Sequence, residues 1–192
     1  MVTATVFIDL QVDFFSHERL RRIRQLLTSN VNALAASARR YGSQVIWVKL
    51  IHAADLHDAS LEVRNGGHRI VIEGTTGANL LPELNVLDSD SVVVKKRYSA
   101  FFRTDLDAIL NRIACKTIIV AGINTHACVR ATVVDAYQRD YSVWIAKDCV
   151  DSYDEEHHAI SMKYMDGKLG IAMTNDQLDA ELLKIYAINK PI

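Results

Sequence analysis

Short apolar runs alternate with helical patterns along nearly the whole chain, and this alternation limits the fold more than any other feature. Six runs of four to seven residues predict strands, at residues 5–10, 44–50, 91–95, 116–121, 142–146 and 170–173. Strands separated by helices pair in parallel through right-handed crossovers. The central runs lack a strict apolar–polar alternation, which is expected where helices cover both faces of a sheet. The sequence therefore predicts a three-layer α/β/α fold around a mainly parallel, six-stranded sheet.

The helices between these strands are marked by start and stop signals. Capping-box patterns open two of them at Thr104 and Thr174, Asp154 can cap a third, and Gly42 follows the end of a fourth. Helices are therefore predicted at residues 29–41, 104–113, 154–165 and from 174 onward, with a further one carrying Cys128 to about residue 140. Residues 52–79 form the one large insertion, which at this length is expected to be functional or partly structured. No composition shift marks a boundary, so residues 1–192 are predicted to form a single domain.

Bulk composition narrows the classes of function. Apolar residues make up 49% of the 192 residues and the net charge is −1, which is typical of a soluble globular protein and does not indicate nucleic acid or a membrane as partner. The odd cysteine count, three, argues for a reducing compartment rather than a disulfide scaffold. No leader pattern or membrane-length apolar run is evident. We therefore expect a cytoplasmic location and a small-molecule substrate.

The region around Cys128 carries the clearest chemical signal. An apolar run at residues 117–121 is followed by a polar turn at 122–125, and the thiol then lies where a helix should begin. Unpaired backbone N–H groups and the positive end of the helix dipole favour a thiolate at such a position. Cys128 is therefore a candidate nucleophile.

Two further reactive residues, Asp9 and Lys95, lie at the ends of predicted strands. The carboxyl ends of parallel strands meet at one edge of a sheet, where ligands bind. A carboxylate, a cation and a thiol in one crevice suit nucleophilic acyl chemistry. Asp9, Lys95 and Cys128 each have an ordinary structural explanation when taken alone. Cys115 and Cys149 are expected to be inert buried residues.

Other kinds of site have less support. No glycine pattern of a dinucleotide or phosphate loop follows the first strand, and no Gly-x-Ser-x-Gly elbow occurs. The insertion holds five residues that could bind a metal ion, namely His52, Asp55, His57, Asp58 and His68. Their spacing fits no helical two-histidine motif, and loop histidines are more often solvated. We therefore predict neither a metal nor a cofactor.

Four segments resemble, in order, those of the isochorismatase-like cysteine hydrolases. They are Asp9-Leu-Gln-Val-Asp-Phe14, Glu73-Gly-Thr-Thr-Gly-Ala78 with Pro82-Glu-Leu84, Lys95-Lys-Arg-Tyr-Ser-Ala-Phe101, and Gly122-Ile-Asn-Thr-His-Ala-Cys-Val129. The resemblance covers nearly the whole chain, and the combination of segments is highly specific.

This resemblance implies a Rossmann-like fold, a homo-oligomer (dimer or tetramer) and a catalytic triad. It makes Cys128 the nucleophile, Asp9 the base and Lys95 the orienting cation, because the three-residue gap to Ser99 selects Lys95 over its neighbour Lys96. It also implies a cis peptide bond between Ile123 and Asn124, with the backbone N–H groups of Asn124 and Cys128 forming an oxyanion hole. Phe14 and Gln11 are expected to contact the substrate, and a core role for Phe14 is equally open.

Two branches of this family differ in chemistry. Hydrolases of amides and ureides keep the cysteine, whereas enzymes resembling true isochorismatases cleave a vinyl ether and often need no thiol. Nicotinamidase-like members usually carry an Asp-x-His metal motif after the second strand, where this chain reads Lys49-Leu-Ile-His52. Because Cys128 is present, the sequence predicts a hydrolase of small amides, ureides or carbamoyl compounds. A vinyl-ether hydrolase and a non-catalytic metabolite-binding protein remain the alternatives.

Overall fold

The computed structural model describes residues 2–189 and contains one six-stranded sheet, in the order β3-β2-β1-β4-β5-β6. Every neighbouring pair of strands is parallel. The strands are β1 (Thr3–Ile8), β2 (Gln44–Leu50), β3 (Ser91–Lys95), β4 (Thr117–Gly122), β5 (Ser142–Val150) and β6 (Ile171–Met173). The strand order reverses beside β1, because β2 lies on one side of it and β4 on the other. Such a reversal opens a crevice at the carboxyl ends of the strands.

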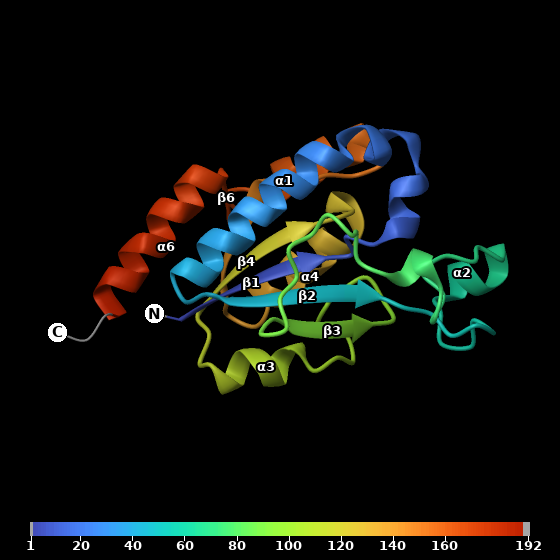
Figure 1. Cartoon of the computed structure of the whole chain (residues 1–192), viewed down its shortest axis with the longest axis horizontal. Coiled ribbons are helices and arrows are strands. Elements are labelled where there is room, and N and C mark those ends of the chain that lie inside the picture. The colour runs from blue at the N-terminus through green and yellow to red at the C-terminus, as the bar shows by residue number, and fades with distance from the viewer. Residues whose placement is uncertain (1, 190–192) are drawn as a thin grey trace.

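Helices cover both faces of this sheet. The α-helices of residues 2–189 are α1 (Glu18–Arg40), α2 (Leu61–Gly66), α3 (Leu106–Arg112), α4 (Arg130–Tyr137), α5 (Glu155–Met165) and α6 (Asn175–Asn189). Figure 1 shows α1 and α6 on one side of the strands and α3 on the other, with α2 beyond the ends of β2 and β3. This arrangement confirms the predicted α/β/α class. No helix within residues 2–189 has the length and apolar character needed to cross a membrane.

Alternate side chains of the strands pack into two separate cores. Phe7, Trp47 and Ile119 pack with α1 and α6 on one face of the sheet. Val6 and Ile46 point to the opposite face and pack with α3, α4 and α5. Because neighbouring strand residues point to opposite faces, a run without polar interruptions fills both cores. This packing explains the continuous apolar runs of β1, β2 and β4.

Several element boundaries differ from the sequence prediction, and β5 ends at Val150, four residues beyond the predicted end at residue 146. The first helix begins at Glu18, eleven residues before the predicted start at residue 29. Its buried stripe includes Leu20, Leu27 and Val31. The first strand ends at Ile8 because Asp9 adopts a left-handed backbone conformation with a φ of 54°.

Two of the three predicted helix N-terminal caps form in the structure. Thr174 and Gln177 exchange the two hydrogen bonds of a capping box, with N···O distances of 3.2 Å and 2.9 Å. Asp154 caps α5 by accepting a hydrogen bond from the His157 N–H at 2.8 Å. The box predicted at Thr104 is wrong, because the carboxylate of Asp107 accepts from Arg139 instead.

The insertion at residues 52–79 folds back onto the carboxyl end of the sheet. His52 forms a parallel bridge with Ile72, and the segment between them contains α2. The Val71 N–H donates to the carboxylate of Asp13 at 2.6 Å, which ties the insertion to the turn after β1. The insertion is therefore partly structured, and it lies at the edge of the sheet where the candidate reactive residues were predicted.

Candidate active site

Asp9, Lys95 and Cys128 meet beneath the crevice at the carboxyl edge of the sheet. The Nζ atom of Lys95 lies 2.8 Å from Asp9 Oδ2 and 3.3 Å from Cys128 Sγ. All three residues are buried, with exposed fractions of 1%, 0% and 5% in the order Asp9, Lys95, Cys128. The left-handed turn at Asp9 directs the chain away from β1, while Lys95 reaches across from β3. The structure therefore brings together the three residues that sequence reasoning selected.

The ammonium group of Lys95 is held from three sides. Besides the carboxylate and the thiol, it donates a hydrogen bond to the backbone carbonyl of Arg97 at 3.0 Å. Three N–H donors thus face three acceptors, which fixes the position of the charge. Lys96 instead pairs with Asp58, with a distance of 2.6 Å between Nζ and Oδ2. The choice of Lys95 over Lys96 agrees with this geometry.

The electrostatics of the three residues differ from the sequence expectation for the thiol. Burial raises the pKa of Cys128 above its ordinary value, and the neighbouring Asp9 carboxylate raises it further. These two effects outweigh the lowering influence of Lys95, so the direction of the pKa shift does not support the expected thiolate. Burial likewise raises the pKa of Asp9. Burial alone would lower the pKa of Lys95, but Asp9 and Cys128 raise it overall. A protonated thiol therefore lies beside a carboxylate of increased basicity.

The loop before Cys128 is shaped by its backbone. The peptide bond between Ile123 and Asn124 is cis, the form that the family resemblance implies. One π-helical turn, η3 (Thr125–Val129), carries Cys128 before α4 begins. The Asn124 carbonyl accepts hydrogen bonds from this turn, whereas the Asn124 N–H has no hydrogen-bond partner within residues 2–189. Asn124 and Cys128 both line the cavity described next, so that N–H group is available to a ligand.

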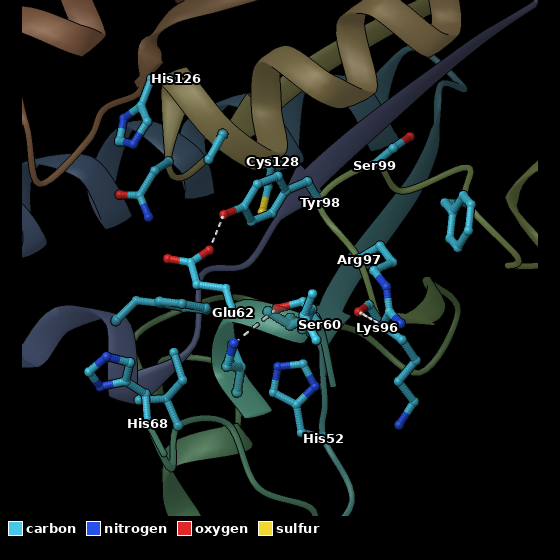
Figure 2. A pocket seen from close by; sticks show the side chains of 18 of the residues that line it. His52, Ser60, Glu62, His68, Lys96, Arg97, Tyr98, Ser99, His126 and Cys128 are labelled. Carbon is cyan, nitrogen blue, oxygen red and sulfur yellow. Dashed lines mark hydrogen bonds between the residues drawn. The ribbon is translucent and has the colours of Figure 1, made fainter. Parts of the chain in front are cut away.

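A cavity of about 990 Å³ lies over Cys128. Figure 2 shows labelled side chains around it from the loop after β3, from η3 and from the insertion. Asp9 and Lys95 lie below Cys128 and are not part of the cavity wall. Phe14 contributes to the wall and also packs against the small cluster of Leu50, Val71 and Ala78. Phe14 therefore lies in the cavity wall and also has a packing role, and its contact with the substrate stays a prediction.

Gln11 has a structural position rather than the expected contact with substrate. Its side-chain amide donates to the carbonyls of Leu50 and Ala78, each at 2.8 Å, and its oxygen accepts from the Leu50 N–H at 2.8 Å. Gln11 is fully buried and does not line the cavity. Its polar atoms join β2 to the insertion, and the predicted substrate contact has no support.

The candidate metal ligands of the insertion do not converge. His57 pairs with Asp55 at 2.6 Å, and Asp58 pairs with Lys96. Across residues 2–189, no three His, Cys, Asp or Glu side chains are grouped so that they could hold a metal ion. His52 and His68 line the cavity instead.

Sequence reasoning missed several polar residues of the cavity wall. Tyr98 and Arg97 come from the loop after β3, and His126 comes from the turn that carries the thiol. The ring of His126 is held by a 2.7 Å hydrogen bond between Nδ1 and the Ser152 hydroxyl oxygen. All three wall residues lie inside the segments that carry the family resemblance, so their proximity to Lys95 and Cys128 in the sequence was the available signal.

Comparison with known protein families gives one consistent result. A family model described as the isochorismatase domain matches residues 3–177. A probable inactive nicotinamidase of Arabidopsis thaliana is 32% identical over 168 residues, which cover 83% of this chain and 86% of that protein.

Solved structures of amide hydrolases share the fold. The nicotinamidase of Bacillus subtilis superposes with a TM-score of 0.78 at 26% identity, covering 91% of this chain and 100% of that chain. The N-carbamoylsarcosine amidase of Thermoplasma acidophilum gives a TM-score of 0.78 at 27% identity, covering 92% of this chain and 98% of that chain.

Proposed function

Because the chain belongs to the isochorismatase family of hydrolases, we propose that it is a cysteine-dependent enzyme that cleaves the C–N bond of a small amide, ureide or carbamoyl compound. The observation that carries this proposal is the buried contact of Lys95 with both Asp9 and Cys128, 2.8 Å and 3.3 Å away, of which Cys128 lines the cavity. The names of two structural relatives, a nicotinamidase and an N-carbamoylsarcosine amidase, also favour amide cleavage over a vinyl-ether reaction.

The reaction begins with transfer of the thiol proton of Cys128 to Asp9. The raised pKa of the Asp9 carboxyl favours this transfer, and Lys95 holds the carboxylate in place. The sulfur then attacks the carbonyl carbon and forms a tetrahedral intermediate. The backbone N–H groups of Asn124 and Cys128 stabilise its oxyanion, and a donor of this kind is typically worth about 3 kcal/mol.

The second half of the cycle releases both products. When the C–N bond breaks, Asp9 returns its proton to the leaving nitrogen and a thioester to Cys128 remains. A water molecule gives a proton to Asp9 and attacks the thioester carbonyl. The sulfur then leaves and recovers the proton, which restores the resting thiol.

Removal of the thiol tests this mechanism directly. We expect Cys128→Ala to lower ammonia release from small amides, ureides and carbamoyl acids by at least about a thousandfold, as for other residues of catalytic triads. It should also abolish the acyl adduct seen by mass spectrometry. Cys149→Ala is the matched control, since Cys149 is buried and does not line the cavity. Full activity of Cys128→Ala in this screen, or cleavage of isochorismate by that variant, would contradict thiol chemistry.

A protein that binds a metabolite without turnover is the second candidate. Two observations favour it, namely the raised pKa of the Cys128 thiol and the relative that is named a probable inactive nicotinamidase. Iodoacetamide separates the two candidates. A catalytic Cys128 should be alkylated at neutral pH much faster than Cys115, whose thiol pKa burial raises to about 11. Equal rates would favour the binding protein.

A further inference from the structure

His52 is a buried histidine whose ring makes no hydrogen bond. Its exposed fraction is 1%, and neither Nδ1 nor Nε2 has a hydrogen-bond partner within residues 2–189. The ring nevertheless lines the cavity above Cys128. A buried polar group without a partner costs free energy, so such a group in a cavity wall indicates a missing ligand.

The backbone of His52 is fully bonded, in contrast to its ring. Its N–H donates to the Val71 carbonyl at 3.0 Å, and its carbonyl accepts from the Glu73 N–H at 2.9 Å. These bonds join the end of β2 to the insertion and fix the position of the Cα atom. The ring is therefore held at the wall by a defined piece of backbone.

His52 lies away from the thiol along the direction of the strands. Leu50 is in register with Lys95, and His52 is two residues beyond Leu50. At about 3.3 Å per residue, the His52 backbone lies roughly 7 Å past the level of Lys95. Figure 2 shows Cys128 on one side of the cavity and the His52 ring on the other. A ligand with a few atoms between two polar groups could contact both.

The charge near His52 favours a negative group on that ligand. Burial lowers the pKa of His52. Asp58 raises this pKa, whereas the positive charges of Lys96, Lys95 and Arg97 lower it. The His52 ring is therefore neutral and carries one N–H donor. Lys96 is paired with Asp58. Arg97 donates to the backbone carbonyls of Asp58 and Lys96, but no carboxylate within residues 2–189 forms an ion pair with it. The Arg97 side chain also lines the cavity.

We propose that His52 determines the substrate specificity of this site by donating a hydrogen bond to a carboxylate that the substrate carries a few atoms from its scissile amide. Arg97 supplies the compensating positive charge. This inference rests on the proposed amide hydrolysis and adds the chemical class of the substrate, which is a small amide or carbamoyl compound with a free carboxylate.

Two chloroacetamides of similar shape test the inference without knowledge of the natural substrate. N-(chloroacetyl)glycine ends in a carboxylate, and N-isobutyl-chloroacetamide ends in an apolar group of similar size. In both, the Cys128 sulfur bonds to the CH2 carbon as chloride leaves, and the thiol proton passes to Asp9. Labelling of Cys128 is followed by intact mass. Each rate is divided by the rate of the same probe with 2-mercaptoethanol, which removes intrinsic differences in reactivity.

We expect the wild-type protein to favour the carboxylate probe by about tenfold, the effect of one hydrogen bond to a charged group. His52→Phe should remove this preference and His52→Gln should retain part of it. His52→Leu provides a second apolar variant if the phenyl ring does not fit. His57→Gln is the matched control, because His57 is an exposed histidine of the same insertion and lies outside the cavity wall. Plain chloroacetamide, which has no second group, should label all variants at the same rate.

Three results would overturn the inference. The first is a wild-type protein without preference for the carboxylate probe, and the second is an apolar His52 variant that keeps the preference. The third is loss of the wild-type preference on treatment with EDTA, which would assign His52 to a metal ion. Failure of plain chloroacetamide to label Cys128 would instead contradict the proposed thiol chemistry, and this inference with it.

Discussion

The residues of the first motif, Asp9-Leu-Gln-Val-Asp-Phe14, perform different tasks although they are close in sequence. Asp9 contacts Lys95 below the cavity, and Phe14 lines the cavity wall. Gln11 bonds only to backbone atoms, and Asp13 binds the Val71 N–H of the insertion. One side chain thus has a chemical role in our proposal, while two others hold the segments that enclose it. In a motif of reactive residue types, more side chains can therefore have structural roles than catalytic ones.

The buried pair of Asp9 and Lys95 makes a strong prediction about stability. Lys95→Met would leave the Asp9 carboxylate without its partner in a fully buried position. We expect the free energy of unfolding to fall by about 3 to 5 kcal/mol, the usual effect of breaking a buried ion pair from one side. Denaturation in guanidinium chloride measures this change.

Two further variants control this measurement. Lys96→Met removes the neighbouring cation, whose ion pair with Asp58 is partly exposed, so the loss should stay at or below about 1 kcal/mol. Asp9→Asn combined with Lys95→Met removes both charges and should regain much of the stability, since Asn tolerates the left-handed conformation of residue 9. The double variant should remain inactive. Equal losses for Lys95→Met and Lys96→Met would contradict the importance of the buried pair.

The close contact of β1 with β4 determines where the nucleophile loop begins. Ile8 is in register with Gly122, the last residue of β4, and the second peptide bond after Gly122, between Ile123 and Asn124, is cis. Gly122 has a φ of +111°, and a Cβ atom at this position would lie 2.1 Å from the Ile8 carbonyl oxygen. Both its conformation and its surroundings therefore require glycine.

Gly122→Ala should consequently be far more damaging than a comparable change elsewhere. We expect a loss of about 3 kcal/mol or more, because the overlap involves backbone atoms of the central strands that cannot move independently. Gly42→Ala is the matched control. Gly42 also has a positive φ, +74°, but no atom lies within 4 Å of the place that a Cβ atom would take there, so only the conformational cost of about 1–2 kcal/mol applies. Thermal unfolding compares the two variants, and similar losses would contradict this account.

The sequence predicted elements well where a local signal dominates. The strand at Ser91–Lys95 agrees in both bounds, and the box at Thr174 forms as expected. The first helix was predicted too short, although Leu20 and Leu27 in its initial turns already mark a buried stripe. The box at Thr104 failed because a distant residue, Arg139, binds its acidic member. Local patterns cannot reveal such long-range partners.

The same limit explains which parts of the site could be predicted. The parallel topology was enough to predict that Asp9, Lys95 and Cys128 lie at one edge of the sheet. The carboxyl ends of parallel strands meet at that edge regardless of how the loops are folded. The sign of the thiol pKa shift was missed because it depends on burial, which the folded chain decides rather than the local sequence. The unpartnered ring of His52 was also hidden, since its isolation depends on every neighbour that the folded chain supplies.

The cavity depends on the attachment of the insertion to the rest of the protein, and Asp13 provides one such attachment. Asp13→Ala would leave the N–H group of the buried Val71 without its acceptor. The loss of such an acceptor typically lowers the free energy of unfolding by about 1–3 kcal/mol. We expect the insertion to open more often, so that trypsin cleaves after the exposed Arg64 or Arg69 roughly tenfold faster. Asp55→Ala is the control, because Asp55 lies in the same insertion but pairs with the exposed His57. Unchanged cleavage in Asp13→Ala, or equal acceleration in both variants, would show that Asp13 does not hold the insertion over the site.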